Sequence, residues 1–180
     1  MENSIIELSK KYDTDKRMDN GIRCRNGVLG HNYAQHYDNI LPHYNIELML
    51  EIGVSWGASI KMWYEYFPMA MIYGMDINEN RFKKKDLEND RIKIVIGDQG
   101  NMYDLLKLNH AWDFIVDDGS HKTDHQLLSF EVLFHYLRSG GLYVVEDIHV
   151  SKFKELFYPS SDVKSVRYFE NNSIVFIEKK

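Results

Sequence analysis

Five short apolar segments, spaced along the chain from residue 46 onward, constrain the fold more than any other feature. Each is nearly continuous in apolar residues and rich in Ile, Val or Tyr, which is typical of strands buried on both faces. Segments with helical patterning separate them, and this alternation predicts a parallel sheet covered by helices. The predicted strands span residues 46–53, 70–77, 91–98, 112–118 and 141–147.

The helical segments between these strands differ in clarity. The clearest one carries Leu127, Phe130 and Leu133 on one face. We expect the pair Gly140 and Gly141 to end this helix, because glycine is the favoured residue just past a helix C-terminus. The predicted helices of this part of the chain span residues 59–67, 78–90, 102–110 and 123–140.

The C-terminal part departs from this alternation. Residues 163–170 and 173–180 are two strand-like runs separated only by Asn171 and Asn172, which predicts a tight hairpin. The predicted fold class is α/β: a Rossmann-like doubly wound sheet of five parallel strands, followed by a C-terminal antiparallel hairpin. The sheet then has seven strands, with helices on both faces.

We expect a single domain over residues 1–180, with residues 46–180 as its Rossmann-like core. Residues 1–45 are predicted to be an N-terminal helical and lid segment. Within them, residues 13–31 are rich in Gly, Asn, Asp and Arg and show no helical or strand pattern. A long loop of this kind is often a lid or a binding loop.

The charge and cysteine content exclude several classes of protein. With 22 basic and 27 acidic residues, the net charge of −5 argues against nucleic-acid binding. No apolar run approaches the length of a membrane span, and the charged start of the chain does not resemble a signal peptide. Cys24 is the only cysteine, so no intrachain disulfide can form. We therefore expect a cytoplasmic protein without a membrane partner; a homo-oligomer stays open.

Acidic residues stand at or near the carboxyl end of every predicted parallel strand. Ligands of open α/β sheets bind outside these ends. One such residue alone is explained as a helix cap or a turn former, but a cluster of like charges needs a cation or a hydrogen-bonding ligand. The residues are Glu51, Asp76, Asp98, Asp117 with Asp118, and Glu146 with Asp147.

The first two strand ends have features of a nucleotide-type site. Gly53 and Gly57 allow a tight turn and a close approach of the backbone to a ligand. The turn lacks the full GxGxxG pattern and a Walker lysine, so a phosphate cradle is poorly supported. Asp76 stands where a carboxylate accepts both hydroxyls of a ribose, and Asp98 or Gln99 can receive a base edge. Together they indicate a nucleoside-containing cofactor.

Several motifs then resemble one known family. The runs MLEIGVSWGASIKMW, GMDI, GDQ, DFIVDDGSH and GGLYVVEDIH are together similar to those of class I S-adenosylmethionine-dependent methyltransferases. More narrowly, DDGSH paired with VEDIH resembles the metal-dependent sugar O-methyltransferases of macrolide biosynthesis, of the mycinamicin type. The upstream runs KYDTDK and HNYAQHYD are similar to the segment that precedes the core in that family.

This resemblance implies S-adenosylmethionine and Mg²⁺ as cofactors. It implies Asp118, Glu146 and Asp147 as the ligands of Mg²⁺ and His121 as the general base. Three carboxylates without cysteine also suit a hard cation on chemical grounds. A sugar hydroxyl is a poor nucleophile at neutral pH, and a metal ion with a nearby imidazole can promote its deprotonation.

The same resemblance implies which strand end contacts each part of the cofactor. Glu51, Gly53 and Gly57 are expected to hold its methionine part and Asp76 its ribose. Asp117 is expected either to contact its amino group or to support the site from beside it. Asp98 or Gln99 is expected to contact its adenine.

The function that the resemblance implies is O-methylation of a sugar hydroxyl, with a carbohydrate or glycoside as substrate. A catechol-type O-methyltransferase would use the same fold and metal, and a degenerate methyltransferase fold could serve as a non-catalytic binding module. A zinc site at His121 and His125 is a further alternative, although the HExxH pattern is missing. His121 can also be a plain helix-terminal residue.

Three aromatic or imidazole side chains stay ambiguous. Tyr33 and Tyr37 have helical spacing and suit either a lid or ordinary packing. His149 follows the VED run and can contact substrate or lie in a loop.

Overall fold

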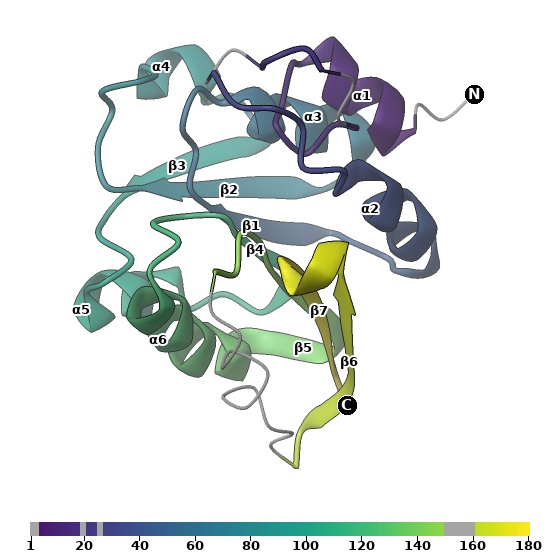
Figure 1. Ribbon diagram of the computed structural model, residues 1–180. Coiled ribbons are helices and arrows are strands. Elements are labelled where there is room, and N and C mark those ends of the chain that lie inside the picture. Colours follow the sequence, from purple (N-terminus) through teal and green to yellow (C-terminus); the bar gives the residue numbers. More distant parts are fainter. Residues whose placement is uncertain (1–3, 19–20, 25–26, 150–160) are drawn as a thin grey trace.

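The computed structural model describes residues 4–18, 21–24, 27–149 and 161–180, and these form one seven-stranded sheet with helices on both faces (Figure 1). The strand order is β3-β2-β1-β4-β5-β7-β6. The first five strands are parallel, while β7 pairs antiparallel with both β5 and β6. The strands are β1 (Leu48–Ile52), β2 (Met71–Asp76), β3 (Ile92–Ile96), β4 (Trp112–Asp117), β5 (Leu137–Val145), β6 (Val163–Phe169) and β7 (Ile174–Lys179).

The helices separate into two layers (Figure 1). On one side of the sheet lie α1 (Ile5–Lys11), α2 (Ala34–Ile40), α3 (Ala58–Tyr66) and α4 (Lys84–Leu87); on the other lie α5 (Met102–Leu105) and α6 (Thr123–Leu133). Short 3₁₀ turns follow at η1 (Leu41–His43), η2 (Leu106–Leu108), η3 (Phe134–Tyr136) and η4 (Glu170–Asn172).

Each layer closes its own apolar core against one face of the sheet. The core under α1 to α3 includes the fully buried Tyr37, Trp63 and Phe114. The core under α5 and α6 includes Trp112 and Tyr143. Along β4, Phe114 and Val116 belong to the first core and Ile115 to the second, because the side chains of a strand alternate between faces. The predicted fold class, with its parallel strands, terminal hairpin and helices on both faces, is confirmed.

The prediction that Gly140 and Gly141 end a helix is wrong. The helical segment after α6 ends at Tyr136, and β5 begins at once, so both glycines lie inside the strand. The register between β4 and β5 shifts between Trp112 and Phe114, which makes this part of β5 bulge. Gly140 has a φ of +76°, a conformation that glycine adopts without strain.

The predicted helix over residues 78–90 is also mostly absent. Only α4, Lys84–Leu87, is helical there. The side chain of Asn78 accepts a hydrogen bond from the backbone of Asn80, and that of Glu79 accepts one from Lys84. Such local side-chain bonds compete with helix formation and favour turns.

The N-terminal segment packs onto the core and does not extend away from it. Asp38 in α2 accepts hydrogen bonds from the backbone N–H groups of Ile5 and Ile6, which joins α1 to α2. Between these helices, the described residues within 13–31 form neither helix nor strand, as predicted. Among the residues that the structure describes, no helix is long and apolar enough to cross a membrane.

Gly53, directly after β1, allows the backbone of this turn to pass close to the backbone that follows β4. Its φ is +95°, and a Cβ atom at this position would lie 1.9 Å from the carbonyl oxygen of Asp118. We expect Gly53→Ala to lower the free energy of unfolding by about 3 kcal/mol, through backbone strain and displacement of the β4 end. Urea unfolding measures this change.

Gly140→Ala is the matched control for this prediction. Gly140 has a similar φ of +76°, but no atom of the described residues lies within 4 Å of a Cβ placed there. Gly140→Ala should therefore lower the free energy of unfolding by only about 1 kcal/mol, the cost of a left-handed backbone conformation in a residue with a Cβ atom. Equal losses in the two variants would contradict the steric role of Gly53.

Candidate active site

The carboxyl ends of β1, β4 and β5 converge because their backbone pairing continues beyond the strands. The N–H of Asp118 donates to the carbonyl of Ile52 at 2.9 Å, and the N–H of Glu146 donates to that of Asp117 at 2.9 Å. Side chains of a strand alternate between faces. Glu51, Asp118 and Glu146 consequently point to the face covered by α1 to α3, whereas Asp117 points toward α6.

Lys16 lies among the three carboxylates of that face. Its Nζ is 2.5 Å from Asp118 Oδ2, 2.8 Å from Glu146 Oε2 and 3.5 Å from Glu51 Oε1. The lysine side chain is only 1% exposed. Burial by itself would lower the pKa of Lys16, but the carboxylates of Asp118, Glu146 and Glu51 raise it well above its ordinary value. Lys16 is therefore a buried, charged counter-ion.

The remaining oxygens of the two deepest carboxylates are also satisfied. The hydroxyl of Tyr37 donates to Glu146 Oε1, so both oxygens of Glu146 have donors. Glu51 accepts hydrogen bonds from the Ser59 hydroxyl at 2.7 Å and from Trp63 Nε1 at 3.1 Å. Burial raises the pKa of Glu51 to about 7. In this buried group of two carboxylates, Glu51 and Glu146, every oxygen therefore already has a partner within the fold.

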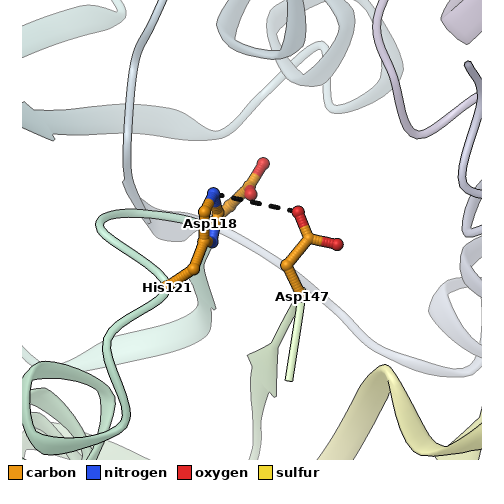
Figure 2. A group of neighbouring side chains, drawn as sticks. All are labelled: Asp118, His121 and Asp147. Atoms are coloured by element: carbon orange, nitrogen blue, oxygen red, sulfur yellow. Dashed lines mark ion pairs between the residues drawn. The ribbon is translucent and has the colours of Figure 1, made fainter. Parts of the chain in front are cut away.

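A cavity of about 680 Å³ opens beside this group. Asp118, His121 and Asp147 line it, and each offers a ligand atom within 4.8 Å of the others. Figure 2 shows the three side chains converging, with His121 Nε2 3.8 Å from Asp147 Oδ2. This is the arrangement that a bound cation or a hydroxyl substrate requires.

Asp147 is held from its far side by the N-terminal segment. The hydroxyl of Tyr33 donates to Asp147 Oδ1 at 2.7 Å, and His31 Nδ1 lies 3.2 Å from the same oxygen. Burial would raise the pKa of Asp147, but the hydrogen bond and the charge of His31 hold it below its ordinary value. Asp147 therefore stays ionised, with its Oδ2 directed toward His121.

The backbone of His121 and Asp147, and the ring of His121, have unusual features for a candidate site. Both have left-handed backbone conformations, with φ of +57° and +53°, which are unusual for residues other than glycine. His121 Nδ1 is buried and has no hydrogen-bond partner among the residues that the structure describes. Because buried polar atoms are normally bonded, this nitrogen fits a site that is completed by a ligand. Two carboxylates beside it suit Mg²⁺, which usually binds through one or two carboxylates plus substrate and water.

The other half of the cavity is formed by the turn after β1. Gly53, Ser55 and Asp76 line it. Asp76 Oδ2 accepts hydrogen bonds from the backbone N–H groups of Val54 and Ser55, both at 2.9 Å. This carboxylate shapes the turn and also faces the cavity.

The other predicted cofactor residues have different surroundings. Among the described residues, the lining of the cavity does not include Glu51, Gly57, Asp98, Gln99 or Asp117. Gln99 Nε2 donates to Asp117 Oδ1 at 2.6 Å, and Asp98 Oδ1 accepts from the backbone of Gly100. Gly57 begins α3 with a φ of +73°. Their contacts with a cofactor stay predictions.

Of the histidines after β4 and β5 that the structure describes, only His121 belongs to the cluster with Asp118 and Asp147. His125 is outside the cluster of Asp118, His121 and Asp147, and its Nδ1 lies 3.0 Å from the hydroxyl of Ser120. The described residues show no metal-ligand group that joins His121 to His125. His149 is exposed, with its ring edge-on to that of His121 at 6.2 Å.

The sequence analysis missed four residues of the site. Lys16 and His31 come from the N-terminal loop, while Trp56 and Arg81 line the cavity on the cofactor side. Trp56 lies between Gly53 and Gly57 in the sequence, so its place at the cavity could have been predicted from that turn. No local pattern distinguishes Lys16 from an exposed lysine, although the run KYDTDK that contains it was recognised.

The comparisons with known proteins agree with this architecture. No family model matches the chain. The demethylmacrocin O-methyltransferase of Streptomyces fradiae is 38% identical over 156 residues, and the mycinamicin VI 2''-O-methyltransferase of Micromonospora griseorubida is 36% identical over 156 residues. Each match covers 80% of this chain and 36% of the relative, so the chain spans about a third of the length of these curated relatives.

A solved structure extends the match to nearly the whole chain. MycE methyltransferase from the mycinamycin biosynthetic pathway, in complex with Mg, SAH and mycinamycin VI, matches with a TM-score of 0.78 and 26% identity. The match covers 99% of this chain and 54% of that one.

The strand order and this match show that the chain has the Rossmann-like methyltransferase fold. In sequence, the chain is similar over 80% of its length to the demethylmacrocin and mycinamicin VI enzymes, so the predicted resemblance to the sugar O-methyltransferases of macrolide biosynthesis is confirmed.

Asp117 makes the stability of the fold depend on pH. Burial raises its pKa to about 7. Between its unfolded pKa of about 4 and this value, the folded chain binds a proton that the unfolded chain has released, so stability falls as pH rises. In Asp117→Asn, we expect the slope of unfolding free energy against pH to be shallower by up to about 1.4 kcal/mol per pH unit. Urea unfolding of both proteins across this pH range measures the slope. Parallel profiles would contradict a raised pKa of Asp117 as its cause.

Proposed function

We propose that this chain is an S-adenosylmethionine- and Mg²⁺-dependent O-methyltransferase that acts on a sugar hydroxyl of a glycoside. The observation that carries the proposal is the convergence of Asp118, His121 and Asp147 in one cavity, with a buried imidazole nitrogen that has no partner among the described residues. The sequence similarity to the demethylmacrocin and mycinamicin VI O-methyltransferases also supports methyl transfer to a sugar hydroxyl. A cavity of about 680 Å³ is within the usual range for a small-molecule site.

In this proposal Asp118 and Asp147 hold the cation. Each has one oxygen bonded by the N-terminal segment and the other left for the cavity: Lys16 bonds Asp118 Oδ2, and Tyr33 bonds Asp147 Oδ1. When bound, Mg²⁺ would supply a Lewis acid that makes an acceptor hydroxyl more acidic, and S-adenosylmethionine the methyl group. Glu146, the third ligand implied by the resemblance, has both oxygens bonded to Lys16 and Tyr37.

His121 accepts the proton of the acceptor hydroxyl. An imidazole is a suitable base near neutral pH, and proton transfer by a positioned side chain contributes about 10²- to 10⁴-fold to rate. The carboxylate of Asp147 lies beside this ring, with Oδ2 3.8 Å from His121 Nε2. The left-handed backbone at both residues fixes their orientation before substrate binds.

On the other side of the cavity, the chain orients the cofactor. Asp76 is held by the backbone of Val54 and Ser55, and we assign it the ribose hydroxyls. Gly53 allows the backbone to approach the methionine part closely. The contribution of these residues is the alignment of the methyl group with the attacking oxygen.

The test of this function is methyl transfer with and without divalent cation. Activity on glycosides should disappear in chelator and return with Mg²⁺. His121→Ala should lose about 10²-fold or more in kcat while it still binds S-adenosylhomocysteine and Mn²⁺, because the carboxylates remain. Calorimetry measures the two affinities.

Three outcomes would each change the assignment. Full activity in chelator would remove the metal from the mechanism. Loss of Mn²⁺ binding in His121→Ala would make His121 a ligand instead of the base. Transfer to catechols but not to glycosides would identify a catechol-type enzyme.

The ribose contact has its own prediction. We expect Asp76→Ala to weaken S-adenosylmethionine binding by at least about tenfold, because it removes two charge-assisted hydrogen bonds. Asp90→Ala is the control, since Asp90 is exposed in a turn before β3. Calorimetry on folded protein decides the question, and equal affinities of the two variants would remove Asp76 from the cofactor site.

A further inference from the structure

His121 lies in the turn that follows β4, and the contacts of this turn with its neighbours set the direction of the imidazole. The backbone of His121 is left-handed, with a φ of +57°. Such a conformation is strained in a residue with a Cβ atom, so it persists only where surrounding contacts hold it. The preceding residue, Ser120, makes contacts of this kind.

Ser120 is bonded on both of its sides. Its backbone N–H donates to Gln99 Oε1 at 2.9 Å, and its hydroxyl is hydrogen-bonded to Nδ1 of His125 at 3.0 Å. The same hydroxyl accepts a hydrogen bond from the backbone N–H of Lys122 at 3.4 Å. These bonds fix the residues before and after His121, and they tie its conformation to the position of His125.

His125 is itself well supported, because it lies in the first turn of α6 and packs against the turn that follows β3. A Cβ atom on Gly100 would lie 2.6 Å from both Cε1 and Nε2 of the His125 ring, so the ring lies directly against the glycine backbone. The carbonyl of His125 accepts a hydrogen bond from the Ser129 hydroxyl at 3.0 Å. The ring therefore has a firm contact on one side and the Ser120 hydroxyl on the other.

We propose that His125 is a positioning residue for the catalytic base: through the hydroxyl of Ser120, it holds the turn after β4 in the conformation that directs His121 toward the cavity and Asp147. This inference rests on the proposed function, because it presumes that His121 accepts the proton of the acceptor. The described lining of the cavity includes His121 but not His125. The two histidines, four positions apart, consequently have different tasks.

The physical consequence of removing the His125 ring is specific. Without it, the Ser120 hydroxyl loses a partner and the strained turn relaxes, which moves the imidazole of His121 away from the acceptor hydroxyl. A displacement of about 1 Å in a reacting group costs roughly 10²-fold in rate. The end of β4 stays in place, since the N–H of Asp118 donates to the carbonyl of Ile52. Cation and cofactor binding should therefore not change.

The experiment is a double-variant cycle on the full chain, measured as kcat with the glycoside that the wild type methylates fastest. We expect His125→Ala to lower kcat by about tenfold or more, while the KM for S-adenosylmethionine and the affinity for Mn²⁺ stay within about twofold. In His121→Ala/His125→Ala, the loss should be no larger than in His121→Ala alone, because residues that act as a unit are not additive. His125→Asn, whose amide has polar atoms near the position of Nδ1, should recover part of the loss.

His135→Ala is the matched control, because His135 is an exposed histidine in η3, beyond the far end of α6. It should keep the kcat of the wild type. A readout without any ligand is the NMR signal of the His121 ring, which should shift in His125→Ala and Ser120→Ala but not in His135→Ala. Ser120→Ala keeps the test decisive if His125→Ala does not fold, since it removes the other partner of the same contact.

Unchanged kcat in His125→Ala would overturn the inference, as would an equal further loss of kcat when this change is made in the His121→Ala background. A raised KM for S-adenosylmethionine at unchanged kcat would make His125 a cofactor contact instead. Wild-type kcat in His121→Ala would refute the proposed function on which the inference rests. The two kinds of failure are therefore distinguishable.

Discussion

The ammonium group of Lys16 balances the negative charge that the parallel sheet gathers at its carboxyl edge. Parallel strands bring their carboxyl ends together, and alternation of side chains directs Glu51, Asp118 and Glu146 to one face. Burying such charges without a partner costs several kcal/mol each. Lys16 lies within 3.5 Å of all three. The N-terminal segment is for this reason part of the core of the site, although it precedes the first strand.

The same segment also bonds to the two carboxylates that line the cavity, Asp118 and Asp147. Tyr33 and His31 bind one oxygen of Asp147, as Lys16 binds one oxygen of Asp118, and the remaining oxygens are left for the cavity. The left-handed backbone at His121 and Asp147 has a cost in stability that surrounding structure must offset. Such strain is typical of sites whose geometry is fixed before the ligand arrives.

The turn after β1 shows how one carboxylate can both hold a turn and line the cavity. Asp76 closes the turn after β1 through Val54 and Ser55, and it also faces the cavity. Asp117 and Gln99, by contrast, bond to each other under α6. Even the adjacent residues Asp117 and Asp118 have different surroundings, because Asp118 lines the cavity whereas Asp117 is buried under α6.

The sequence by itself determined the sheet, its hairpin and the edge at which polar residues gather, because periodicity and strand ends are local properties. It also identified Asp118, His121 and Asp147 through two short runs, DDGSH and VEDIH. It did not reveal the bulge at Gly140, the turn in place of a helix after β2, or the burial of Lys16. The turn depends on local side-chain hydrogen bonds of Asn78 and Glu79 that the helical pattern does not show. The bulge depends on strand register, and the burial of Lys16 depends on contacts with residues more than a hundred positions away. Only the tertiary structure decided which oxygen of each carboxylate is already bonded and which is left for a ligand, since no local pattern specifies a contact of that range.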